Sequence, residues 1–142
     1  MIRPEDSQLQ IELLNDVAEL GGGFEGHIRR SPVDGAANPQ GMGQVRAVRL
    51  TLRMFTDGRG STDSEEYGEI EAAVDEYGMT STPFLLPVPV DAPISYDGSL
   101  IRIRWQLVVR TDRKMALDSK METEVLVVPQ GGANLYRRPH PL

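Results

Sequence analysis

Five arginines are the residues of this sequence whose type and spacing most clearly suggest binding chemistry. They alternate with apolar residues in two separate stretches, so each group would share one face if both stretches are β-strands. If the two strands shared a sheet and a face, the guanidinium groups would form a basic stripe. Such a stripe could hold an acidic peptide or a phosphorylated partner through bidentate hydrogen bonds. The five residues are Arg49, Arg53, Arg102, Arg104 and Arg110.

The alternative is that these arginines pair with carboxylates of the protein itself. Glu122 and Glu124 lie on the last predicted strand, where they could face the arginines across the sheet. Such cross-strand ion pairs each contribute roughly 0.2–1 kcal/mol to stability. We favour this structural interpretation over the binding interpretation.

A carboxylate-rich segment, Asp57–Glu66, suggests a second kind of site. Hard cations such as Ca²⁺ prefer clustered oxygen ligands, which Asp57, Asp63, Glu65 and Glu66 could supply. The segment does not follow the EF-hand pattern, because an arginine and a serine occupy the third and fifth ligand positions. We therefore expect the solvent-exposed end of a β-hairpin, with a calcium or small-ligand site as the alternative.

Catalytic chemistry finds little support in the residue types. The chain has no cysteine and two histidines, His27 in a predicted strand and His140 between two prolines. A nucleophile needs an adjacent base and an oxyanion site, and no G-x-S-x-G serine motif or zinc-ligand spacing accompanies either histidine. We expect His27 to be a surface residue of its strand, and the protein to be neither an enzyme nor dependent on a cofactor.

Composition narrows the class of protein further. The length of 142 residues suits one domain, and the formal net charge of −6 argues against nucleic-acid binding. Glycine (14) and proline (10) are scattered between short apolar runs, which favours an all-β fold. No run reaches the roughly 18 apolar residues of a membrane-spanning helix. The N-terminus lacks the apolar core of a signal peptide, so we expect a cytoplasmic protein.

The longest alternating pattern, Ser99–Thr111, predicts the central strand. Its apolar residues fall on every second position and include Trp105, the only tryptophan, which we expect to be the largest contributor to the core. Val45 is out of phase with the residues after it, which predicts a bulge near Arg46. Further strands are predicted over Gln8–Leu14, Phe24–Arg30, Val45–Phe55 and Met121–Val128.

Other segments are irregular or ambiguous. Residues 65–78 combine helical spacing with strand alternation, so a short helix and an acidic edge strand compete. The prolines of Thr82–Val90 exclude a fully paired central strand and predict an extended segment paired on one side at most. Gly21–Gly23 predicts a turn, Ser31–Gly43 a long loop and residues 130–142 a flexible tail.

Three groups of motifs resemble those of the arrestin-type β-sandwich, in the N-terminal-domain-like form found in arrestins, retromer-type subunits and bacterial sporulation-control proteins. Glu19–Ile28 resembles the glycine-containing second-strand motif, although Leu20 stands where the family has a proline. Phe84–Gly98 resembles the proline-rich connector. Ile101–Leu107 and Val125–Val127 resemble the closing strands.

The resemblance implies a fold and a broad role. The fold would be a single antiparallel β-sandwich of seven to eight strands, immunoglobulin-like and arrestin-type, over residues 1–129. The role would be non-catalytic: an adaptor, scaffold or regulatory module that binds a protein partner through sheet edges or loops. Self-association through an edge strand is a related expectation. A complete arrestin has two sandwiches and this chain has room for one, so a mechanism based on contact between two domains does not carry over.

Overall fold

The computed structural model describes residues 9–31, 45–58, 60–75, 78–113 and 119–133. Within these ranges the chain is all-β, and it contains no helix long and apolar enough to cross a membrane. The strands are β1 (Leu9–Leu13), β2 (Val17–Glu19), β3 (Gly23–Arg30), β4 (Val45–Gly58), β5 (Ser61–Ala73), β6 (Thr80–Pro87), β7 (Tyr96–Asp97), β8 (Ile101–Arg113) and β9 (Ser119–Val128).

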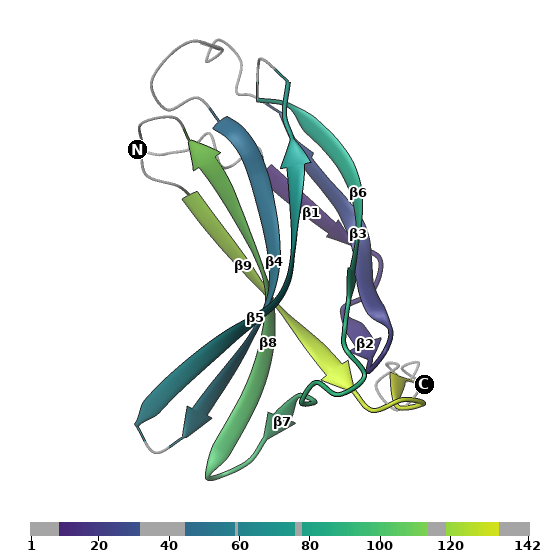
Figure 1. Ribbon diagram of the computed structural model, residues 1–142, viewed down its shortest axis with the longest axis vertical. Helices are drawn as coiled ribbons and strands as arrows, with labels where there is room; N and C mark the ends of the chain where they lie inside the picture. The colour runs from purple at the N-terminus through teal and green to yellow at the C-terminus, as the bar shows by residue number, and fades with distance from the viewer. Residues whose placement is uncertain (1–8, 32–44, 59, 76–77, 114–118, 134–142) are drawn as a thin grey trace, which may run out of the picture.

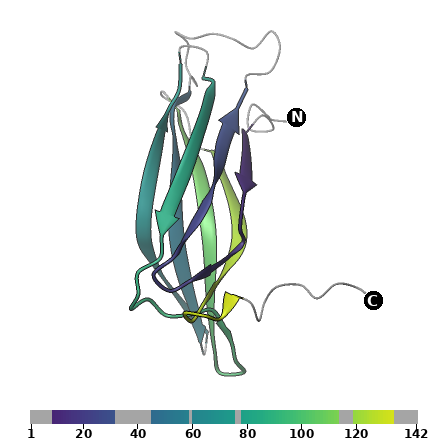
Figure 2. The same ribbon diagram turned by 90° about the vertical axis from the view of Figure 1, so that its right-hand side faces the viewer.

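These strands form two sheets that pack face to face. The smaller sheet has the order β1-β3-β6, and the larger has the order β2-β9-β8-β4-β5 with β7 paired to β8. Figure 1 shows the two layers from the side, and Figure 2 shows the smaller sheet in front of the larger. The prediction of an all-β, two-sheet fold is confirmed.

Two details of the architecture differ from the prediction. The described residues form nine strands rather than seven or eight, because the short strands β2 and β7 were not recognised. The sheets are also not wholly antiparallel, since β2 runs parallel to β9. Strands of two and three residues are too short to show an alternating pattern.

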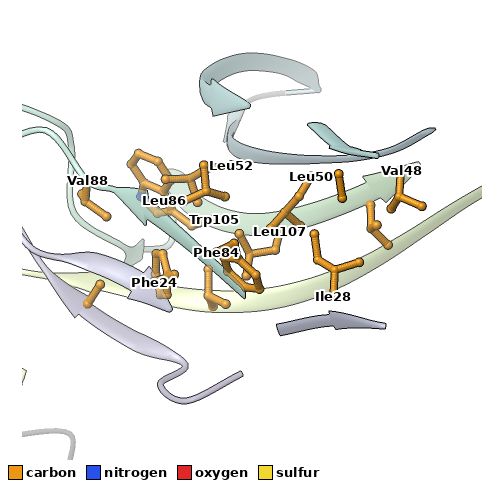
Figure 3. Close-up of a cluster of buried hydrophobic side chains, with 14 of the residues drawn as sticks. Phe24, Ile28, Val48, Leu50, Leu52, Phe84, Leu86, Val88, Trp105 and Leu107 are labelled. Atoms are coloured by element: carbon orange, nitrogen blue, oxygen red, sulfur yellow. The ribbon is translucent and has the colours of Figure 1, made fainter. Parts of the chain in front are cut away.

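The predicted central strand is confirmed, because β8 lies between β4 and β9. Trp105 is completely buried, and its indole N–H donates a hydrogen bond to the Pro93 carbonyl oxygen at 3.1 Å. Figure 3 shows this side chain among those of Phe24, Leu52 and Leu86, which come from both sheets. The core is therefore the contact between the two sheets, with Trp105 its largest fully buried side chain.

Residues 61–73 form an edge strand, which settles the ambiguity between helix and strand over 65–73. β5 pairs with β4 and is the last strand of its sheet. Leu52 pairs with Gly68 and Arg53 with Glu66, so Tyr67 is an extra residue at a β-bulge. The bulge explains the misleading helical spacing, because one added residue converts a period of two into a step of three. The predicted bulge near Arg46 is also present, as a register shift between Val45 and Ala47.

The predictions for the proline-rich segment and for the acidic segment both agree with the structure. Among the described strands, β6 lies at the edge of the smaller sheet and pairs with β3 alone, as the prolines predicted. The predicted solvent-exposed hairpin end over Asp57–Glu66 is confirmed: β4 continues to Gly58, β5 begins at Ser61 and pairs with β4, and residues 60–66 are exposed. Positive φ at Gly60 (84°) allows the short turn between them. The turn at Gly21–Gly23 is confirmed, and Gly21 has φ of 84°.

Two further predictions concern segments largely outside the described residues, namely the Ser31–Gly43 loop and the flexible tail. Of the tail, residues 130–133 are described, and the Ala133 amide donates a hydrogen bond to Glu19 Oε2 at 3.2 Å. The domain boundary at residue 129 stays a prediction.

Candidate functional site

The five predicted arginines lie on one face of the larger sheet, as the stripe hypothesis required. β4 and β8 are adjacent, and Arg49 lies directly opposite Arg110 in the register. Arg53 occurs two pleats further along β4, and Arg102 and Arg104 lie on the same face of β8. This is the outer face, because the alternate residues of both strands point into the core.

Arg49 sits among three carboxylates on this outer face. Its Nε lies 3.6 Å from Glu69 Oε2, and its Nη2 lies 3.8 Å from Glu71 Oε2 and 3.5 Å from Asp112 Oδ2. Asp112 also pairs with Arg46, whose Nη2 lies 3.1 Å from Asp112 Oδ1. The guanidinium group of Arg49 is thus flanked by negative charge from β5 on one side and β8 on the other.

Three more arginines of the stripe form ion pairs. Arg53 donates a hydrogen bond to Glu66 on β5 at 2.7 Å. The distances are 3.0 Å for Arg102 with Asp97 and 3.1 Å for Arg104 with Asp57. Arg110 has no carboxylate within ion-pair distance among the described residues. An acidic partner would therefore have to displace carboxylates of the protein from four of the five arginines.

The structural interpretation is thus supported, but the predicted partners are wrong. Glu124 lies opposite Gln106 and Glu122 opposite Val108, so neither faces an arginine directly. Glu122 is instead 3.4 Å from Lys120. The arginines pair mainly with β5, whose position at the edge next to β4 depends on the order of strands in the sheet.

We expect the Arg53–Glu66 pair to contribute little to stability despite its short distance. The Arg53 side chain is only 16% exposed, but Glu66 is 54% exposed, and ion pairs open to solvent have coupling energies of about 0.2–1 kcal/mol. A double-mutant cycle of Arg53→Ala and Glu66→Ala in urea denaturation measures this coupling. Arg53 also lies 5.9 Å from the centre of the Phe55 ring. The single Arg53→Ala variant and the double variant both lose this contact, so its energy cancels in the cycle. A coupling energy above about 2 kcal/mol would contradict the view of this face as a solvated ion-pair network.

The four carboxylates of the alternative calcium site do not converge. In the register with β4, Glu66 and Asp57 lie on the outer face, whereas Asp63 and Glu65 lie on the inner face. Asp57 is also engaged within the protein, by Arg104 and by a hydrogen bond from the Thr62 hydroxyl at 2.8 Å. Among the described residues, no group of three or more His, Cys, Asp or Glu side chains could hold a metal ion.

His27 is a strand residue at the surface. Its Nε2 is 2.9 Å from the Ser81 hydroxyl in an exposed hydrogen bond between β3 and β6. His140 lies outside them.

An open hollow lies at one end of the larger sheet, and its lining includes the first part of the Asp57–Glu66 segment, which sequence analysis gave as the alternative small-ligand site. In Figure 1 the ends of β4, β5 and β8, together with β7, run past the smaller sheet at the bottom of the view. We call this region the open end. The hollow there has a volume of about 380 Å³, and its lining includes Asp57, Thr62, Leu100, Ile101 and Arg102.

The open end exposes three large apolar side chains close together in the chain. Tyr96 is 54% exposed, Leu100 68% and Ile101 41%. Tyr96 pairs with Ile103 in β8, and the Gly98 amide closes the turn by donating to the Ile101 carbonyl oxygen at 3.0 Å. The sequence held one signal: Leu100 and Ile101 are consecutive, so alternation cannot turn both into the core.

The Tyr67 phenol on β5 lies near two carboxylates. Burial raises the pKa of the Tyr67 phenol above its ordinary value, and the carboxylates of Glu65 and Asp91 raise this pKa further. Tyr67 packs against Trp105 with the ring centroids 4.9 Å apart. Because its pKa is raised, the Tyr67 hydroxyl stays protonated at neutral pH.

Comparison with known proteins supports the fold. No protein-family model matches the chain, and no curated protein matches it. Among solved structures, the chain is similar to the crystal structure of Spo0M, a sporulation control protein from Bacillus subtilis, with a TM-score of 0.60 and 13% sequence identity. The match covers 85% of this chain and 49% of that one, so the chain spans about half the length of this neighbour. The arrestin-like fold predicted from the motifs is confirmed.

Proposed function

We propose that this chain is a non-catalytic protein-interaction module that acts as an adaptor, scaffold or regulatory domain. The observation that carries the proposal is the open end of the larger sheet, where Tyr96, Leu100 and Ile101 are exposed beside a hollow of about 380 Å³. Grouped apolar side chains on a surface are typical of sites that bind another protein.

The composition of the open end suits a protein partner. Exposed apolar side chains lie beside Asp57, Thr62 and Arg102, which line the hollow. Protein interfaces commonly combine an apolar centre that includes aromatic residues with a polar rim. A partner that covered Leu100 and Ile101 would remove apolar surface from water at about 25 cal/mol per Å².

The test is affinity capture from the source organism with matched variants. We expect Leu100→Ser/Ile101→Ser to reduce capture of a specific partner by about tenfold or more, since apolar anchors commonly dominate binding energy. Leu85→Ser is the matched control, because Leu85 is also exposed (56%) but lies on β6 of the other sheet. Thermal unfolding of each variant establishes that it is folded.

Two outcomes would overturn this proposal. One is equal loss of capture by the Leu100→Ser/Ile101→Ser variant and by Leu85→Ser. The other is the absence of any protein retained by the unmodified chain above the level on bare resin.

The same proposal includes a cytoplasmic, bacterial setting and a single immunoglobulin-like, arrestin-type domain over residues 1–129. It is supported by the sequence motifs and by the fold of the sporulation control protein. Homo-oligomerisation through a sheet edge stays a prediction, and the acidic side chains of β5 oppose it at that edge.

A further inference from the structure

β5 offers a long open edge for backbone hydrogen bonding. The strand runs along β4 from Ser61 to Ala73, and no other described strand pairs with it. Figure 2 shows it along the outer margin of the larger sheet. On such an edge, alternate residues direct their N–H and C=O groups away from the sheet, where an added strand can bind them.

The edge also has a defined charge pattern. Glu66, Glu69 and Glu71 lie on the outer face, with side chains 50–56% exposed. Asp63 and Glu65 add negative charge on the inner face, and the strand has no basic residue. A cationic strand would therefore meet opposite charge from Asp63 to Glu71, where Glu66, Glu69 and Glu71 also pair with Arg53 and Arg49.

β4 shows which kind of strand pairs with this sequence. On the outer face it places Arg49 and Arg53 against the glutamates of β5, at 2.7–3.8 Å. On the inner face it places Leu50 and Leu52 in the core. A strand added on the open side of β5 would face the same glutamates and lie next to Ile70 and Ala72 on the inner side. The same alternation of basic and apolar residues would suit it.

A second copy of the chain does not fit this edge. Pairing β5 with another β5 would bring two rows of carboxylates together, and like charges directly opposite each other destabilise a sheet. The edge of the smaller sheet at β6 is also less suited to strand addition, because Pro83 and Pro87 have no N–H to donate.

We propose that the β5 edge binds an extended basic segment of a partner protein as an added strand. Lysine or arginine at alternate positions of that segment would lie beside Glu66, Glu69 and Glu71, with apolar residues at the positions between. This assignment rests on the protein-interaction function proposed above and names the chemistry of one partner.

A labelled peptide in which arginine alternates with valine tests the strand addition by fluorescence anisotropy. Two further peptides are methylated at the backbone. One carries an N-methyl group on the amide nitrogen of every arginine residue, and the other on the amide nitrogen of every valine residue. Alternate residues of a strand direct their N–H groups to the same side, so each set of methyl groups blocks one edge of the peptide. We expect one N-methylated peptide to bind like the parent and the other to bind about tenfold more weakly or worse.

Protein variants locate the site. We expect Glu69→Gln/Glu71→Gln to weaken binding of the parent peptide by about fivefold, because each substitution removes one cross-strand charge pair with the peptide. The control is Glu122→Gln/Glu124→Gln, which removes the same charge from exposed positions on the same face of β9. Its binding should stay within about twofold of the unmodified protein.

Several outcomes would overturn the assignment. Equal binding of both N-methylated peptides would mean that charge alone holds the peptide. Equal weakening in the β9 control would place the site elsewhere, and no binding of the parent peptide at low salt would remove it. A protein dimer in sedimentation that the peptide dissociates would assign the edge to a second copy. None of these outcomes would affect partner capture that depends on Leu100 and Ile101. The two proposals are therefore tested separately.

Discussion

Replacement of Trp105 by alanine is expected to lower the free energy of unfolding by about 3–5 kcal/mol. The indole is completely buried between the sheets, packs on Tyr67 and donates a hydrogen bond to the Pro93 carbonyl. Its removal loses apolar contacts from both sheets and leaves a cavity that the surrounding strands can fill only in part. Urea denaturation followed by circular dichroism measures the change, and a loss below about 1 kcal/mol would contradict the role of Trp105 in the core.

Two further variants make this measurement interpretable. Tyr96→Ala removes an aromatic ring that is 54% exposed, so we expect a loss below about 1 kcal/mol. Trp105→Phe keeps most of the apolar volume and should have intermediate stability. It gives a measurable value if Trp105→Ala does not fold, since domains have only about 5–15 kcal/mol of stability in total.

The second large effect is expected for Gly26→Ala in β3. A Cβ at this position would overlap with the Glu12 carbonyl oxygen and lie 2.9 Å from two ring atoms of Phe84. The carbonyl belongs to β1, which pairs with β3, so relief requires the two strands to separate. Overpacking of this kind costs about 1–3 kcal/mol, and we expect the loss at or above the upper end because the main obstacle is backbone.

Gly68→Ala in β5 is the matched control. The atom nearest to its added Cβ is Leu86 Cδ2 at 3.4 Å, the end of a flexible side chain. Stability should change by no more than about 0.5 kcal/mol, or rise slightly, since alanine reduces the entropy of the unfolded chain. Similar losses for the two glycine variants would show that close approach of β1 to β3 is not the reason for glycine at position 26.

Features set by neighbouring residues in the chain were predictable. The alternation around Trp105 identified both β8 and its buried face, because a strand turns successive side chains to opposite sides. The prolines at positions 83 and 87 identified β6 as a strand paired on one side, because proline has no N–H for a second neighbour. The motifs added the arrangement of these elements in an arrestin-like fold.

Features that depend on which strands are neighbours in a sheet could not be predicted from the sequence. The partners of Arg49 and Arg53 are on β5 rather than β9, and a local pattern does not reveal which strand lies next to β4. The bulge at Tyr67 gave part of β5 a helix-like spacing of apolar residues. The bulge can be identified only from the pairing of β5 with β4, which the sequence does not show. Likewise, Leu100 and Ile101 are exposed because the larger sheet extends past the smaller one (Figure 1).

The amino-acid sequence by itself determined most of the longer strands, their buried faces and the residue at the centre of the core, since each depends on a period of two along the chain. The tertiary structure alone decided which charges are paired and which apolar side chains remain in water. These properties depend on the register between segments far apart in the chain, which the residue types of one strand do not reveal.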